Sequence, residues 1–117
     1  MSRPIKLVLD CLDPTALGEF WAAALGYAVV GSVENYTLLA ADDAGPELLL
    51  QKVTEPKAGK NRMHLDITCA DVAGEVARLE RLGARRAGDE VEEHGNHWVV
   101  LLDPEGNEFC VCDGGEP

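Results

Sequence analysis

The amino-acid sequence predicts an α+β fold in which one unit, a strand followed by a helix and three further strands, occurs twice. Two observations lead to this prediction. Each half of the chain carries one amphipathic helix that an aspartate opens, and strand-like segments surround that helix in the same order in both halves. Short motifs also recur at matching places in the two halves, which favours an internal duplication.

The first half begins with a strand-like segment over residues 5–11, followed by the dipeptide Asp13-Pro14. Aspartate caps the free N–H groups of a helix, and proline suits the first helical position. Apolar residues then follow at helical spacing and Gly26 supplies a left-handed C-cap, so we expect a helix over residues 14–25. Three further strands are expected, over residues 27–33, 36–41 and 47–53.

The second half repeats this order. A strand is expected over residues 63–69, Asp71 caps the next helix and Gly83 ends it. The remaining strands are expected over residues 85–91, 97–102 and 108–112.

A turn motif strengthens the case for a repeat. Asp42-x-x-Gly45-x-Glu47 in the first half returns as Asp103-x-x-Gly106-x-Glu108 in the second. In each copy the aspartate would start the turn and the glycine would adopt a positive φ. We therefore expect one domain over residues 1–117, with repeats at about 4–53 and 61–113 and a polar linker over residues 54–60.

Composition excludes several classes of partner. The formal net charge of −11 argues against binding to nucleic acid or to anionic lipid, because both attract clustered lysine and arginine. No apolar stretch approaches the roughly 18 residues that cross a bilayer, and residues 1–5 lack a charged-then-apolar leader pattern. We therefore expect a cytoplasmic protein. The four cysteines, Cys11, Cys69, Cys110 and Cys112, are then expected to be reduced, buried apolar side chains.

The repeat also predicts where a binding surface would lie. A unit of this kind has a helix on one face of its sheet only, and the opposite face needs a cover, either the second unit or a ligand. We expect the two sheets to face each other across a cleft lined by alternate strand residues. Lys6 and His64, each seven residues before a capping aspartate, would both project into that cleft.

These features resemble the vicinal oxygen chelate superfamily, which includes glyoxalases, extradiol dioxygenases and bleomycin-resistance proteins. More narrowly, the chain looks like a bacterial glyoxalase-like domain. The resemblance spans nearly the whole chain and implies paired βαβββ modules that form a U-shaped, mostly antiparallel sheet around a cleft, frequently in a homodimer. It rests on Asp13-Pro14 with Phe20-Trp21 and Leu25-Gly26-Tyr27, on Asn61-Arg62-Met63-His64-Leu65-Asp66-Ile67, and on Asp103-Pro104-Glu105-Gly106-Asn107-Glu108-Phe109.

The resemblance also gives metal-ligand positions. Metal-dependent members hold a divalent ion with histidine, glutamate or glutamine from the first and last strands of each half. The first, third and fourth positions fall on Lys6, His64 and Cys110, and the second falls on Leu49 or, with the strand shifted by two, on Gln51. An ammonium repels a divalent ion and leucine has no lone pair, so we expect neither a metal nor another cofactor. If a metal does bind, its ligands are His64, Gln51 and Cys110.

His64 is the first candidate catalytic residue, as an acid/base group, against the alternative of a satisfied core histidine. Lys6 would either stabilise negative charge or extend to the rim of the cleft. Arg62 lies two residues before His64 and would either grip a carboxylate or lie exposed at a strand edge. Asp66 shares the face of His64 and would orient it or act as a base.

The segment 92–98 holds two histidines and an amide in an expected hairpin loop, where binding groups often gather. His97 is therefore a candidate binding residue. Trp98 would either stack on a ligand or, as we favour, pack against the protein. The predicted ligand-binding set is Gln51, Arg62, Asp66, His97, Trp98 and Cys110.

The function that we expect is small-molecule binding by a member of this superfamily with a degenerate metal site. One alternative is a lyase or isomerase-like enzyme that acts on a small metabolite with His64 and Lys6. Another is a non-catalytic protein that sequesters a drug, for which the acidic surface suits a cationic ligand. A structural or regulatory partner with an empty cleft is the third. A small-molecule ligand and a second copy of the chain are the expected partners.

Overall fold

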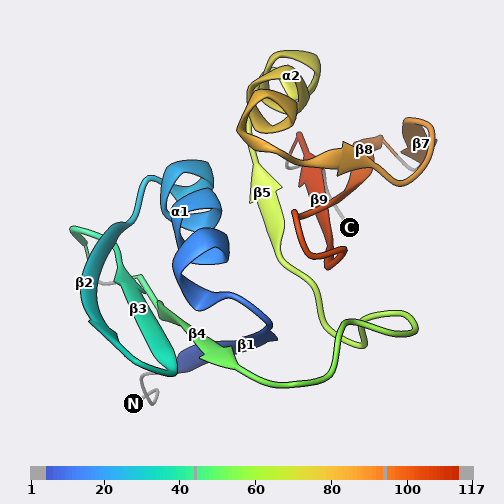
Figure 1. Ribbon diagram of the computed structural model, residues 1–117. Helices are drawn as coiled ribbons and strands as arrows, with labels where there is room; N and C mark the ends of the chain where they lie inside the picture. The colour runs from blue at the N-terminus through green and yellow to red at the C-terminus, as the bar shows by residue number, and fades with distance from the viewer. Residues whose placement is uncertain (1–4, 44, 94, 114–117) are drawn as a thin grey trace. The chain divides into compact units, whose positions relative to one another are not determined.

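The computed structural model describes residues 5–43, 45–93 and 95–113, and the chain divides into two compact units, Met1–Lys57 and Ala58–Pro117 (Figure 1). We call these units the first and second modules. Each module has one helix and one mixed sheet, which confirms the predicted α+β fold built on two βαβββ units. The boundary between the modules falls in the segment 54–60 that the sequence predicts as a linker.

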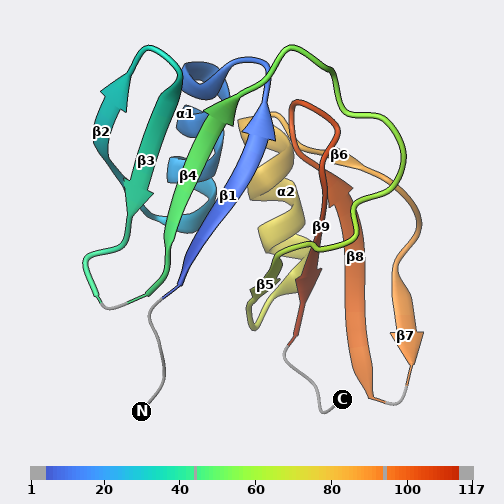
Figure 2. The same ribbon diagram turned by 90° about the horizontal axis from the view of Figure 1, so that it is seen from below.

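The first module consists of β1 (Lys6–Cys11), α1 (Pro14–Leu25), β2 (Ala28–Val33), β3 (Tyr36–Ala40) and β4 (Glu47–Lys52). Its sheet has the order β1-β4-β3-β2. The first and last strands, β1 and β4, run parallel, from the pair Lys6 and Glu47 to the pair Cys11 and Lys52 (Figure 2). The other strand pairs are antiparallel.

Local signals set both ends of α1. The Asp13 carboxylate accepts a hydrogen bond from the Ala16 N–H at 3.1 Å, and Pro14 occupies the first turn. Gly26 closes the helix with φ of 70°, in the left-handed region where glycine meets no steric penalty. These signals give the helix the bounds that the sequence predicts.

The core of the first module lies between α1 and its sheet. The helix buries Leu17, Phe20 and Trp21, whose two aromatic rings meet edge to face with centroids 5.1 Å apart. Leu39 and Leu50 face this layer from the sheet and are fully buried. A Cβ on Gly18 would lie 3.0 Å from the Thr37 methyl carbon, so the helix approaches β3 closely there.

The second module consists of β5 (Asp66–Thr68), α2 (Val72–Leu82), β6 (Arg85–Arg86), β7 (Val91–Glu93), β8 (Asn96–Leu102) and β9 (Glu108–Cys112). The order in its sheet is β5-β9-β8-β6, with β7 also paired to β8. The first and last strands are again parallel neighbours. The Asp71 carboxylate caps α2 through the Gly74 N–H at 3.0 Å, and Gly83 ends the helix with φ of 120°.

The core of the second module is built in the same way. One face of α2 packs on one face of the sheet and excludes water. Its buried apolar residues are Val72, Val76, Leu79, Val99, Leu101, Phe109 and Val111.

Three sequence expectations are wrong in the second module. The single strand expected over residues 85–91 is two short strands, β6 and β7, because Ala87, Gly88 and Asp89 between them favour strands poorly. The strand expected over 63–69 is shortened to β5. The hairpin loop expected over 92–98 is mostly paired strand, with His97 opposite Glu92. His94, which is expected in that loop, lies outside the described residues.

The recurring turn motif also differs between the modules. In the second module Asp103 is fully buried and its carboxylate accepts hydrogen bonds from the backbone N–H groups of Glu105 and Asn107, each at 2.9 Å. Gly106 has φ of 86°, as expected. In the first module Asp43 rather than the expected Asp42 accepts from the Gly45 N–H, at 2.9 Å. The sequence repeat is therefore not a repeat of hydrogen bonds at this turn.

Among the described helices, neither is long and apolar enough to cross a membrane.

Candidate functional site

The face of the second sheet that α2 leaves uncovered carries most of the chemistry of this module. Side chains alternate along a strand, so the residues between the buried ones point to this helix-free face. Asp66, Cys110 and Val100 form one row across three strands, and Thr68, Cys112 and Trp98 form the next. Members of both rows are half-buried or exposed, in contrast to the buried Val99, Leu101 and Val111 between them.

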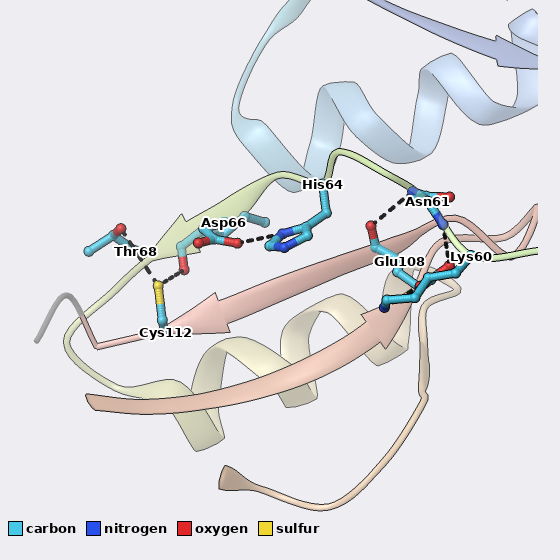
Figure 3. Close-up of polar contacts among 8 residues, drawn as sticks. Lys60, Asn61, His64, Asp66, Thr68, Glu108 and Cys112 are labelled. Atoms are coloured by element: carbon cyan, nitrogen blue, oxygen red, sulfur yellow. Dashed lines mark hydrogen bonds and ion pairs between the residues drawn. The ribbon is translucent and has the colours of Figure 1, made fainter. Parts of the chain in front are cut away.

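His64 lies just before β5, and Glu108 fixes the segment that carries it. The Glu108 carboxylate accepts hydrogen bonds from the Lys60 ammonium at 2.9 Å and from the Asn61 N–H at 3.2 Å (Figure 3). The Leu65 carbonyl accepts from the Cys110 N–H at 2.9 Å. Hydrogen bonds therefore connect the segment before β5 to β9 on both sides of His64.

His64 and Asp66 form a direct contact, with 2.9 Å between the imidazole Nδ1 and the carboxylate Oδ1 (Figure 3). Both side chains are about half exposed, at 46% and 53%. The alternative interpretation of the sequence, a buried core histidine, is therefore wrong for His64. This contact orients the imidazole ring toward the carboxylate.

Cys110 lies beside this pair on the neighbouring strand, directly opposite Asp66. Burial raises the pKa of the Cys110 thiol to about 11, and the negative charge of Asp66 and a hydrogen bond to it act in the same direction. The Lys60 ammonium opposes this shift. Without a bound cation, Cys110 is therefore a neutral thiol at physiological pH.

The donor atoms of His64, Asp66 and Cys110 all lie within 4.8 Å of one another, in an arrangement that could hold a metal ion. We call these residues the second-module trio. His64 and Cys110 both belong to the metal-ligand set expected from the sequence, in which the third ligand is Gln51 and not Asp66. The spacing of two residues between His64 and Asp66 is the signal for the third member.

Strand register decides between the two assignments of the second ligand position. Asp66 pairs with Cys110 in the second module, and Val8 pairs with Leu49 in the first. Val8 and Asp66 stand at the same distance from their capping aspartates, so Leu49 corresponds to Cys110, and Gln51 corresponds to Cys112. The four family positions are then Lys6, Leu49, His64 and Cys110. An ammonium and an alkyl chain do not fit a divalent ion.

Lys6 and Gln51 belong to the first module. The Lys6 ammonium lies 3.8 Å from the Glu47 carboxylate across the parallel pair, with 47% of the lysine side chain exposed. Gln51 is half-buried in β4, opposite Asp10. The position of these residues relative to His64 across a cleft stays a prediction.

The remaining predicted residues separate into two groups. Trp98 is half-buried on the helix-free face opposite Cys112, and Arg62 is exposed on the segment before β5. His97 neighbours Trp98 on β8 and therefore points to the other face, where its Nε2 contacts the Glu90 carboxylate. The structure thus brings Trp98, but not His97, to the face of the second-module trio.

The cysteines are free, as expected, but only Cys11 is buried. Cys69, Cys110 and Cys112 are half-buried. Cys112 shares the helix-free face with Cys110, and its sulfur donates to the Ile67 carbonyl oxygen at 3.7 Å and lies 3.9 Å from the Thr68 hydroxyl. Cys112 and Thr68 also lie on the helix-free face and are not among the predicted site residues, although their spacing of two from Cys110 and Asp66 predicts the shared face.

Comparison with known proteins identifies the family. Residues 6–112 match the model of the glyoxalase-like domain family. No curated protein matches the chain.

Several solved structures share the fold. A glyoxalase/bleomycin resistance protein/dioxygenase family enzyme from Burkholderia phytofirmans is 18% identical with a TM-score of 0.78, covering 92% of this chain and 95% of its own. A glyoxalase-related enzyme from Fulvimarina pelagi is 17% identical with a TM-score of 0.77, covering 97% and 89%. A lactoylglutathione lyase from Agrobacterium tumefaciens is 19% identical with a TM-score of 0.70, covering 97% and 95%. The chain therefore belongs to the glyoxalase-like domain family, within the vicinal oxygen chelate superfamily.

Proposed function

We propose that the protein binds a small molecule on the helix-free face of its second sheet. The main support for this proposal is the set of side chains that adjacent strands place on that face. Ionisable and polar side chains of His64, Asp66 and Cys110 stand beside the indole of Trp98 and its neighbour Val100. A few placed polar groups among apolar and aromatic side chains are typical of small-molecule sites.

The helix-free face of the first sheet has a similar mixture of charged and apolar side chains. On its helix-free face Lys6 and Asp10 alternate with Val8, which is 55% exposed, and Tyr36 on β3 is 41% exposed. Apolar side chains in such positions are costly to leave in water. This face of the first module is therefore a second candidate surface for a small molecule.

Charge favours a particular ligand class. The chain has a formal net charge of −11, and the site face carries the Asp66 carboxylate. A cationic or neutral aromatic compound suits such a surface better than an anion does, because the long-range field attracts positive charge. Trp98 adds a stacking surface that also favours a cation.

A thermal-shift screen tests the proposal. Purified protein would be heated with cationic, neutral aromatic and anionic compounds, with a chelator present so that metals play no part. We expect at least one compound to raise the melting temperature in a saturable way, since a ligand at 100 times its Kd adds about 2.7 kcal/mol to the free energy of unfolding.

Variants locate the effect. Trp98→Ala and Asp66→Asn should weaken the shift, whereas Glu80→Gln on the exposed side of α2 should leave it unchanged. A screen in which no compound shifts the wild type argues against the proposal. So does a shift that survives both site-face variants.

Catalysis is a second candidate function, as a lyase or isomerase-like reaction on a small metabolite. It is favoured by the 2.9 Å contact between His64 Nδ1 and the Asp66 carboxylate. A carboxylate that orients an imidazole is the usual arrangement for a histidine general acid or base. Lys6 would stabilise the negative charge that develops on the substrate.

Turnover distinguishes catalysis from sequestration, as in a drug-resistance protein. Compounds that bind would be incubated with wild type and with His64→Gln and analysed by mass spectrometry. Chemical conversion that His64→Gln abolishes, with binding retained, supports an enzyme. Binding without conversion supports sequestration.

We also propose a homodimer in the cytoplasm. A domain of this size leaves much of its surface in water, and exposed apolar residues such as Val30 and Val33 add to the gain from association. Light scattering at micromolar concentration should give twice the chain mass of 12.6 kDa, and a monomer would count against the dimer.

A further inference from the structure

We propose that the second module by itself binds a thiophilic divalent cation, zinc first, through the imidazole of His64, the carboxylate of Asp66 and the thiolate of Cys110. The inference goes beyond the proposed small-molecule function and does not depend on it. It also departs from the family positions, because Asp66 is not among them and no ligand comes from the first module.

The distances suit one small ion. Zinc holds nitrogen and oxygen ligands at about 2.0–2.2 Å and sulfur at about 2.3 Å, so two ligands of one ion are separated by less than about 4.6 Å. The donor atoms of the second-module trio lie within 4.8 Å of one another before any ion is present. The His64 and Asp66 side chains are about half exposed, so they have room to rotate toward a bound ion.

The backbone pre-arranges these donors. Cys110 and Asp66 are paired residues of neighbouring parallel strands, and His64 follows the same alternation two residues before Asp66. Glu108 binds the preceding segment through Lys60 and Asn61. The ion would therefore meet three donors that the fold already holds together.

The donor set selects the metal. One nitrogen, one oxygen and one sulfur suit zinc, whereas magnesium and calcium prefer six or more oxygen ligands. A coordinating thiol is deprotonated by the cation, so the neutral Cys110 thiol becomes a thiolate on binding. Three protein ligands leave a fourth position for water or a ligand, which is the pattern of open rather than closed zinc sites.

The first module provides an internal comparison. Its residues at the three equivalent positions are Lys6, Val8 and Leu49, and none is a ligand for a divalent ion at neutral pH. A site that depended on both modules would need Gln51, whereas the proposed site would not.

Cobalt gives the test a readout that reports the sulfur ligand. Metal-free protein would be titrated with Co²⁺ and followed by absorption. We expect saturation at one ion per chain and a near-ultraviolet band from thiolate-to-cobalt charge transfer. Added Zn²⁺ should abolish the band by displacement, and Mg²⁺ in excess should not.

Matched variants assign the ligands. Cys110→Ser should remove the band, and His64→Ala and Asp66→Asn should each weaken the affinity for zinc at least about tenfold, since loss of even an outer-shell partner costs 10–100-fold. Cys112→Ser is the matched control, because Cys112 shares the face but is occupied by the Ile67 carbonyl. Gln51→Ala tests the two-module alternative. Both controls should behave as wild type, and circular dichroism would confirm that each variant is folded.

The proposal fails if cobalt gives no sulfur band with folded wild type, or if the band survives Cys110→Ser and disappears with Cys112→Ser. It also fails if Gln51→Ala weakens binding as much as His64→Ala does. The screen for small molecules contains a chelator, so failure here leaves that result unaffected and the two proposals are judged separately.

Discussion

The two modules share one topology and differ in what their helix-free faces carry. In both, a capped helix covers one face of a sheet whose first and last strands are parallel neighbours. The positions occupied by His64, Asp66 and Cys110 in the second module hold lysine, valine and leucine in the first. Core and caps follow the repeat, and the reactive groups do not. Duplication of a fold therefore gives no assurance that its chemistry is duplicated.

The largest expected effect tests whether the modules depend on each other. Leu17→Ala removes a side chain that is 1% exposed under α1 and should destabilise the protein by about 2–5 kcal/mol. Each module has one tryptophan, Trp21 or Trp98, so the single-tryptophan variants Trp98→Phe and Trp21→Phe report each module by fluorescence during urea unfolding.

If residues 1–117 form a single cooperative domain, as the sequence predicts, Leu17→Ala lowers both midpoints together. A lower midpoint for Trp21 alone would show two independent domains. Glu19→Gln, on the exposed side of α1, serves as the control and should change the free energy of unfolding by less than about 0.5 kcal/mol.

The next effect contrasts the two turns. Asp103→Ala removes a buried acceptor and leaves the Asn107 N–H and side-chain amide without their partner, at a cost of about 1–3 kcal/mol for each unsatisfied buried group. Asp43→Ala removes one exposed hydrogen bond and should cost about 0.5 kcal/mol. Thermal unfolding measures both. Equal losses would show that the turns are energetically equivalent despite their different hydrogen bonds.

A third prediction concerns the reactivity of Cys110, because the helix-free face of the first module carries no cysteine. The thiolate is the nucleophile, and the pKa of Cys110 is raised from 9.0 to about 11, so its thiolate fraction near neutral pH falls about a hundredfold. Alkylation of Cys110 by iodoacetamide should rise about tenfold per pH unit and still be rising at pH 10, where the denatured chain has levelled off.

Asp66→Asn removes the negative charge and the hydrogen bond that raise this pKa, so Cys110 should then react faster at pH 8. Peptide mapping by mass spectrometry separates Cys110 from the other cysteines. A native rate equal to that of the denatured chain would contradict the raised pKa.

The last prediction concerns the helix caps, which the two modules share. Asp13→Ala and Asp71→Ala each remove a hydrogen bond to the first turn of a helix, to Ala16 in one and to Gly74 in the other. Each should lower the free energy of unfolding by about 1 kcal/mol. Similar losses in chemical denaturation would show that the two caps are energetically equivalent. A loss for one variant only would show that they are not.

Local signals explain which parts of the fold the sequence predicts well. The bounds of α1 follow from Asp13, Pro14 and Gly26, which act within a few residues. The extents of β6 and β7 depend instead on how each strand pairs with β8, which lies further along the chain. Strands formed by distant partners are therefore harder to predict than capped helices.

The candidate site shows the same limit. Position in the repeat selects His64 and Cys110, and alternation adds Asp66 to the same face. The choice between Leu49 and Gln51 needs the pairing of Val8 with Leu49, and the separation of His97 from Trp98 needs the register of β8. Both depend on cross-strand contacts between residues that are far apart along the chain.

The parallel pairing within each module has a mechanical consequence. The chain enters a module through its first strand and leaves it through the last, and these strands are hydrogen-bonded neighbours that run the same way. Tension applied to the ends of a module therefore shears all of these bonds at once, instead of opening them one after another. The first module pairs residues 6–11 with 47–52, and the second pairs only 66–68 with 110–112. The second module should therefore unfold at a lower pulling force than the first.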